Sequence, residues 1–271
     1  MAIKINDVQM HVLNMKTRFP FRYGIASLVA LPHLFVRVEA DVDGKPSVGL
    51  SADGLPPKWF TKNPEAPFDA DLDEMLAVIR NAEGLAREAG PADTAFDLWS
   101  EIYAGQASWA DSTEYPPLLW AFGVSLVERA VIDAVCRASG TDFATAVRNG
   151  ALGIRLGSIH PELEGKQPSD LLVPEPLGSI RIRHTVGLTD PLTAADIPAE
   201  DRLSDGLPQS LEDNIAYYGL THLKIKLCGD ADTDRARLKG IAELMSGRAC
   251  EFTLDGNEQY TELKTIWMDL S

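Results

Sequence analysis

The first third of the chain alternates apolar and polar residues with the period of two that is typical of half-buried β-strands. The alternation covers residues 3–15 and 33–40, and a shorter run covers residues 47–51. Asp43-Gly44 lies between the second and third runs and is a strong hairpin-turn signal. The pattern predicts an antiparallel sheet that packs one face against a core.

Helical spacing of apolar residues follows the predicted sheet. One helix is indicated around residues 72–79, where Asp69 or Asp71 could cap its N-terminus. A longer helix is predicted to start after Pro116-Pro117 and to run to about Ser139, where Gly140 is in position to end it. The broad apolar face of this longer helix indicates that it is largely buried.

Proline and glycine interrupt the pattern over residues 141–179, which is typical of a linker or an insertion. Strands and helices then alternate along the chain, and this alternation predicts a parallel sheet. The strands are expected at residues 180–186, 221–227 and 251–255, and the helices at 210–218, 233–245 and 261–270. We therefore divide the chain into residues 1–140, 141–179 and 180–271.

The length of the last segment limits the sheet that it can form. A closed barrel of eight parallel strands takes about 250 residues, or about 31 for each strand–helix unit. The stretch from residue 180 to residue 271 holds about three such units. We therefore expect a partial (β/α) barrel of about three units out of eight, with the chain stopping before the barrel can close.

A hydrophobic fraction of 45% and a net charge of −15 indicate a globular, acidic protein. The acidic excess argues against nucleic acid or an anionic membrane as partner. The N-terminus lacks the apolar core of a signal peptide, and no apolar run is long enough to span a bilayer. Cys136, Cys228 and Cys250 are odd in number and far apart, which favours reduced thiols over disulfides or a zinc cluster. We therefore expect a cytoplasmic protein.

Two lysines stand on one predicted strand near the C-terminus. Lys224 and Lys226 share a face of this strand, because side chains alternate, and the apolar residues between them take the opposite face. On a half-exposed strand such lysines simply point into water. In a barrel interior a lysine is costly unless it has a function. Burial and a neighbouring ammonium both favour the neutral amine, which is the form that can act as a base.

A carboxylate follows the next predicted strand along the chain. Asp255-Gly256 by itself is an ordinary turn signal. At the end of a strand, however, Asp255 would project as an oxygen ligand for a hard cation such as Mg²⁺. Asn257 could hold that carboxylate in place or touch a substrate. Since Lys226 and Asp255 end neighbouring strands, we expect them to border one site.

These residues resemble the enolase superfamily, and in particular its mandelate racemase and muconate-lactonizing branch. The resemblance rests on Lys224-Ile225-Lys226, on the helix start Asp234-Arg235 and on Leu254-Asp255-Gly256-Asn257. It implies an α+β N-terminal capping domain followed by a barrel. It also implies a Mg²⁺-dependent lyase or isomerase that removes the proton next to the carboxylate of a small molecule and stabilises an enediolate. Lys226 would be the base, Lys224 its electrostatic helper and Asp255 a metal ligand.

The resemblance also points to two lid segments in the N-terminal third, residues 18–24 and 51–59. Loops at these places close over the substrate in family members. Arg22 would then pair with a substrate carboxylate, and Tyr23 or Trp59 would wall the pocket. Each of these three side chains could equally be a solvated loop residue.

Part of the family pattern lies beyond Ser271. The family's two further acidic metal ligands and its second acid–base group come from later strands, so the resemblance implies weak or absent Mg²⁺ binding in this chain. Our leading hypothesis is a truncated, inactive relative of these enzymes. One alternative is a non-catalytic interaction module or gene fragment that forms a homo-oligomer through its open barrel edge. Another is a different α/β fold in which Lys224, Lys226 and Asp255 merely coat a surface.

Overall fold

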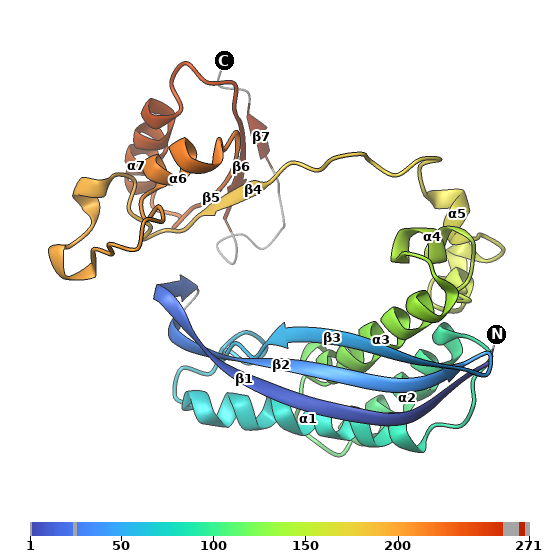
Figure 1. Ribbon diagram of the computed structural model, residues 1–271. Coiled ribbons are helices and arrows are strands. Elements are labelled where there is room, and N and C mark those ends of the chain that lie inside the picture. The colour runs from blue at the N-terminus through green and yellow to red at the C-terminus, as the bar shows by residue number, and fades with distance from the viewer. Residues whose placement is uncertain (1, 24–25, 257–265, 269–271) are drawn as a thin grey trace. The chain divides into compact units, whose positions relative to one another are not determined.

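The computed structural model describes residues 2–23, 26–256 and 266–268 (Figure 1). The chain divides into two compact units, Met1–Pro176 and Leu177–Ser271, which we call the first and second units. Each unit has a hydrophobic core of its own. Each unit therefore packs around its own core.

A three-stranded antiparallel sheet forms one layer of the first unit, in the order β1 (Ile3–Tyr23), β2 (Ala26–Val42) and β3 (Lys45–Gly54). Asp43 and Gly44 both have positive φ, as a tight hairpin turn requires. The predicted strands and turn are confirmed. Strands β1 and β2 extend well beyond the predicted runs.

Three helices cover one face of this sheet (Figure 1): α1 (Phe68–Glu88), α2 (Ala95–Ala110) and α3 (Pro117–Ser139). The long helix ends at Gly140, whose φ of 64° is the left-handed conformation that ends helices. The predicted cap of α1 is wrong, because the N-cap is Pro67. Asp69 and Asp71 lie in the first helical turn, where their negative charges interact favourably with the positive end of the helix dipole.

Helix α3 lies unusually close to β3. At Gly49 an added Cβ would collide with the carbonyl oxygen of Ala130 and the backbone nitrogen of Ala134. The α3 carboxylate of Asp133 accepts a 2.9 Å hydrogen bond from the backbone N–H of Leu50 in β3. The sheet strand and the helix are therefore joined both by close packing and by a polar contact.

The proline-rich stretch after α3 contains short helical elements. These are α4 (Phe143–Arg148), η1 (Leu156–Ser158), η2 (Pro161–Leu163) and α5 (Pro168–Leu171). Arg148 donates hydrogen bonds of 2.5 and 2.7 Å to the carbonyl oxygens of Val173 and Pro174. The stretch is thus irregular but anchored.

The second unit contains a sheet in the order β4 (Arg183–Val186), β5 (His222–Lys226), β6 (Glu251–Asp255) and β7 (Ile266–Met268). The first three strands are parallel, as predicted. The turns η3 (Ala194–Asp196) and η4 (Ala199–Asp201) and helix α6 (Leu211–Tyr218) connect β4 to β5, and helix α7 (Ala231–Leu244) connects β5 to β6. Leu223 and Ile225 are buried in the core that these helices share with the sheet.

The helix predicted over residues 261–270 is wrong at residues 266–268, which form β7 and pair antiparallel with β6. The edge of β6 offers unpaired backbone groups that a strand can satisfy. The rest of that predicted helix lies outside the described residues. No helix in the described part of the chain has the length and apolar character needed to cross a membrane.

Candidate functional site

The parallel sheet of the second unit has one apolar and one polar face. Leu223 and Ile225 take the apolar face and are fully or almost fully buried. Lys224 and Lys226 take the opposite face, and the strand register places Lys226 directly beside Asp255 of β6. Period-two alternation on two neighbouring strands therefore produces the juxtaposition that the sequence predicts.

Both lysines contact the same carboxylate oxygen. The Nζ of Lys224 lies 3.0 Å and the Nζ of Lys226 lies 2.9 Å from Oδ2 of Asp255. All three side chains are between one fifth and one quarter exposed. Asp255 therefore bridges the two lysines of the neighbouring strand.

The same polar face continues towards the amino ends of the strands. Thr253 is buried beside Lys224 in the register and accepts a 3.4 Å hydrogen bond from Nη1 of Arg183. At the far end, Arg181 Nη1 lies 3.0 Å from Oε1 of Glu251 and 2.9 Å from Nε2 of His222. The face is therefore polar throughout, with its lysine–aspartate cluster at the carboxyl ends of the strands.

Helix α7 fixes the two loops that follow β4 and β5. Asp234 accepts hydrogen bonds from the backbone N–H of Cys228 (2.9 Å) and of Gly229 (3.0 Å), and from the Cys228 thiol (3.2 Å). Burial raises the pKa of Asp234, but these bonds outweigh it and leave the pKa below its usual value. From the sequence, Asp234 could be placed only at the start of a helix, because its hydrogen bonds to the loop depend on the tertiary structure.

The loop after β4 is held by an arginine that sequence reasoning missed. Arg237 Nη2 donates to the carbonyl oxygens of Gly187 (2.5 Å) and Asp190 (2.9 Å). Burial lowers the pKa of Arg237, and Asp190 and Asp196 act against that shift. A helical arginine has many possible partners, so no local signal could have identified this contact.

His184 lies on the face of β4 that packs against the helices, opposite to the lysines. It is half-buried, and burial lowers the pKa of its imidazole while Asp190 opposes the shift. The residue therefore has the surroundings of a core histidine.

The described residues do not fit a Mg²⁺ site on their own. They contain no group of three or more His, Cys, Asp or Glu side chains that could hold a metal ion. Asp255 is the carboxylate at the lysine cluster, and both ammonium groups already contact it. Mg²⁺ needs near-octahedral oxygen coordination, and this cluster provides one candidate protein ligand.

The predicted lid residues belong to the first unit. Arg22 is exposed near the end of β1, in a segment that is strand rather than loop. Trp59 is 55% exposed, beyond the end of β3. The side chain of Tyr23 and the whole of Asn257 lie outside the described residues. Their roles in substrate binding stay predictions.

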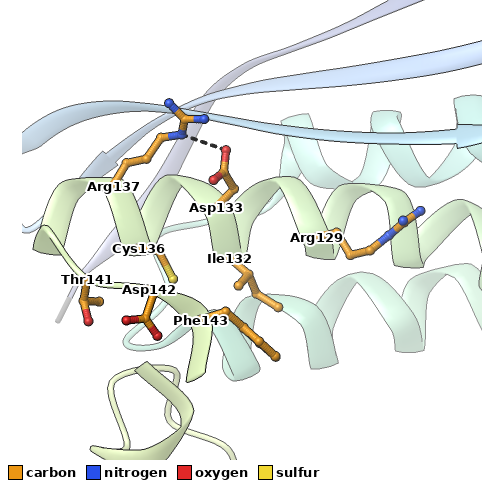
Figure 2. A pocket seen from close by; sticks show the side chains of 8 residues that line it. All are labelled: Arg129, Ile132, Asp133, Cys136, Arg137, Thr141, Asp142 and Phe143. Carbon is orange, nitrogen blue, oxygen red and sulfur yellow. Dashed lines mark hydrogen bonds and ion pairs between the residues drawn. The ribbon is translucent and has the colours of Figure 1, made fainter. Parts of the chain in front are cut away.

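A pocket of about 640 Å³ lies in the first unit beside α3 and the start of α4 (Figure 2). Ile132 and Cys136 lie on the side of α3 that is turned away from the sheet, together with Phe143, whereas Arg137 and Asp133 point towards the sheet. Burial, with Asp133 and Asp142 nearby, raises the pKa of the Cys136 thiol. The thiol therefore stays protonated and is a poor nucleophile.

Comparison with known proteins finds no matching family model and no matching curated protein. Solved structures do match. An enolase from Bradyrhizobium, complexed with magnesium and mandelic acid, is 17% identical at a TM-score of 0.56, covering 95% of this chain and 55% of that one. A mandelate racemase/muconate lactonizing enzyme-like protein from Rubrobacter xylanophilus is 16% identical at a TM-score of 0.55, covering 95% and 54%. A dipeptide epimerase from Methylococcus capsulatus, complexed with Mg and a dipeptide, is 18% identical at a TM-score of 0.53, covering 95% and 55%.

These likenesses define the fold of the chain. It combines an α+β capping domain with a partial (β/α) barrel, as in the enolase and mandelate racemase structures. The resemblance inferred from sequence is confirmed at this level, and the hypothesis of a different α/β fold is wrong. The chain spans about 55% of the length of the matching structures.

Proposed function

We propose that this chain carries the base-bearing part of a site that removes the proton next to the carboxylate of a small molecule. The observation that supports this is the contact of Lys224, Lys226 and Asp255 at the carboxyl ends of two neighbouring parallel strands. Barrels of parallel strands build their active sites at these ends.

The proposed chemistry begins when a substrate carboxylate binds to the ammonium of Lys224. Lys226, as the neutral amine, takes the proton from the adjacent carbon. The C–H bond breaks, an N–H bond forms, and the electron pair moves into the carboxylate to give an enediolate next to the Lys224 charge. Racemisation, epimerisation and elimination all share this first step.

The described arrangement is a resting state for that chemistry. Lys226 contacts the carboxylate of Asp255, and this contact must break before its amine can take a proton from a substrate. The enolase and dipeptide epimerase structures contain magnesium, but the described residues of this chain do not fit this ion. We therefore expect negligible turnover from this chain alone.

Binding of a simple carboxylate tests the proposal. Saturation-transfer NMR with mandelate as the probe is expected to detect weak binding to the wild-type chain. Lys224→Ala and Lys226→Ala should each abolish it, because each removes an ammonium from the site. Lys239→Ala, which removes an exposed lysine of α7, is the matched control and should bind like the wild type. Equal binding by all four proteins would exclude the lysine pair as the recognition site.

Proton exchange is a separate readout. Loss of the α-proton signal of mandelate in D₂O should proceed at the background rate with the wild-type chain. A faster rate that Lys226→Ala abolishes would show that the chain is active, which contradicts the expectation of negligible turnover. A faster rate that survives Lys226→Ala would contradict the role of Lys226 as the base.

A second candidate function is that of an interaction module. It is favoured by the exposed apolar side chains that precede β4, where Ile180 is 84% and Ile182 is 74% exposed.

A further inference from the structure

The end of β5, where Lys226 lies, has less support from the sheet than the middle of that strand. The pairing of β5 with β4 ends at Ile225, whereas its pairing with β6 continues to Lys226 and Asp255. One further bond of this ladder follows, a 3.0 Å hydrogen bond from the backbone N–H of Leu227 to the carbonyl oxygen of Asp255. Within the described residues, the sheet therefore holds Lys226 from the side of β6 alone.

The loop that follows this strand end is fixed by a side chain of α7. Cys228 and Gly229 come directly after Leu227, and Gly229 has a φ of 86°, in the left-handed region that favours glycine. In this conformation the backbone N–H groups of both residues reach the carboxylate of Asp234, at 2.9 and 3.0 Å. The Cys228 thiol lies 3.2 Å from the same carboxylate. Asp234 thus holds the chain where it leaves the sheet.

Helix α7 has another residue for its own cap. Asp230 is the N-cap and accepts a 2.8 Å hydrogen bond from the backbone N–H of Thr233. Asp232 adds negative charge in the first turn, where it favours the helix. The Asp234 carboxylate, in contrast, accepts its hydrogen bonds from the preceding loop. Two acidic residues four positions apart therefore act differently, Asp230 on the helix and Asp234 on the loop.

We propose that Asp234 is a positioning residue for Lys226, an inference that rests on the function proposed above. By fixing Cys228 and Gly229, its carboxylate keeps the end of β5 in register with β6 and Lys226 in place to take a substrate proton. Small displacements matter there, because a base must lie within hydrogen-bond distance of the proton that it removes. Lys224 pairs with both β4 and β6, so its position depends less on the loop.

Trace acetylation with acetic anhydride measures the position of each lysine without a substrate. The reagent must reach the lone pair of Nζ, so an amine in contact with Asp255 should react slowly and the exposed Lys239 of α7 should react fast. Tandem mass spectrometry gives the rate at each residue. In Asp234→Asn one acceptor oxygen remains, and Lys226 should react several-fold faster than in the wild type while Lys224 changes little. Asp234→Ala, which keeps neither oxygen, should show a larger acceleration.

Asp230→Ala is the matched control. It removes an acidic side chain from the same end of α7 together with the helix cap, but it leaves the bonds from Cys228 and Gly229 to Asp234 intact. Its two acetylation rates should therefore match those of the wild type. General loosening of the fold would accelerate both lysines together, so the ratio of the Lys226 rate to the Lys224 rate reports positioning. Melting curves verify that each variant is folded at the labelling temperature.

Saturation-transfer NMR with mandelate connects this position to the proposed function. Mandelate should bind several-fold more weakly to Asp234→Asn than to the wild-type chain, and it should bind Asp230→Ala like the wild type. A raised acetylation ratio without mandelate binding to the wild-type chain would support the placement of Lys226 by Asp234 and would overturn the function proposed for that lysine.

Three results would overturn the positioning role. The first is an unchanged ratio of the Lys226 rate to the Lys224 rate in both Asp234 variants, whether or not mandelate binds. The second is an equal rise of that ratio in Asp230→Ala, which would assign the effect to the helix end in general. The third is mandelate binding of wild-type strength in Asp234→Ala. Asp234→Asn preserves the shape of the side chain, so the test stands even if Asp234→Ala does not fold.

Discussion

At the scale of single residues, Lys58 and Asp71 form a buried ion pair in the first unit. Each side chain is 4% exposed, and the Nζ of Lys58 lies 3.1 Å from Oδ2 of Asp71. The same Nζ donates 2.6 Å to the carbonyl of Ala66, and the backbone N–H of Lys58 donates 2.7 Å to Asp71. The pair holds Lys58 at a φ of 60°, which is unfavourable for a residue with a side chain.

Breaking this pair should be strongly destabilising. Asp71→Ala leaves a buried ammonium without its carboxylate, and we expect a loss of about 3–5 kcal/mol in the free energy of unfolding. Urea denaturation followed by circular dichroism measures it. The double variant Lys58→Met, Asp71→Leu should recover much of the loss, because it leaves no buried charge. A double variant as unstable as Asp71→Ala would contradict this account.

His184 should make stability fall in mild acid. Its folded-state pKa lies below that of the unfolded chain, so acidification protonates the unfolded form first. Stability is therefore fully present above about pH 6.5 and declines as the pH falls towards the lowered folded pKa. The melting temperature of His184→Gln should fall less on acidification than that of the wild type. Identical losses would show that His184 does not contribute.

Residue-scale prediction from sequence works where one local rule applies. Period-two alternation is sufficient to place Lys224 and Lys226 on one face, and strand succession places Asp255 beside them. Asp71 could not be interpreted in the same way. Its position suggested a helix cap, but its partner Lys58 comes from a preceding loop with an unusual backbone conformation.

At the scale of elements, the close approach of α3 to β3 depends on Gly49. Gly49→Ala should lower the free energy of unfolding by about 1–3 kcal/mol or more, because the added methyl group meets the backbone of α3. Gly84→Ala is the matched control in α1, where an added Cβ contacts nothing. It should stabilise the protein by about 0.5–1 kcal/mol through helix propensity. Thermal denaturation compares the two, and equal effects would argue against the packing role of Gly49.

The elements predicted best are those whose stability is mostly local. The capped helices α3 and α6 and the strands β5 and β6 lie close to their predicted ranges, whereas β4 begins at Arg183, three residues after its predicted start at Ile180. Residues 18–23 were expected to form a loop, yet they extend β1 by pairing with β2. The structure has a register irregularity there, between Lys16 and Phe21, which accommodates Pro20. Such pairing depends on the partner strand and leaves little local signal.

At the scale of the whole molecule, the two units are joined by an exposed stretch. Residues 171–183 are all exposed, and residues 172–182 form no helix or strand. Exposed irregular backbone is where proteases cut first. Brief treatment with trypsin should therefore cleave at Arg181 before any site inside α1–α3. The N-terminal product should keep its helical circular dichroism, since its core lies within the first unit. Early cleavage inside α3 would contradict this.

The whole-molecule architecture was predictable only in part. Counting residues for each strand–helix unit indicates a partial barrel. The matching solved structures agree with this, because the chain covers only about 55% of their length. The antiparallel strand β7 was not predictable, because it depends on which edge of β6 is open. Metal ligation likewise depends on how many carboxylates converge in space, which spacing along the chain does not specify.

The hydrogen bond from Leu50 to Asp133 has a consequence for hydrogen–deuterium exchange. The amide of Leu50 is covered by a carboxylate from a helix and not by a neighbouring strand. Its exchange therefore reports the undocking of α3, whereas amides bonded between β1 and β2 exchange only when the sheet itself opens. In Asp133→Asn the side-chain oxygen remains, and protection should persist in part. In Asp133→Ala it should vanish at Leu50 while the sheet interior stays protected, so one amide becomes a sensor of how α3 and the sheet separate.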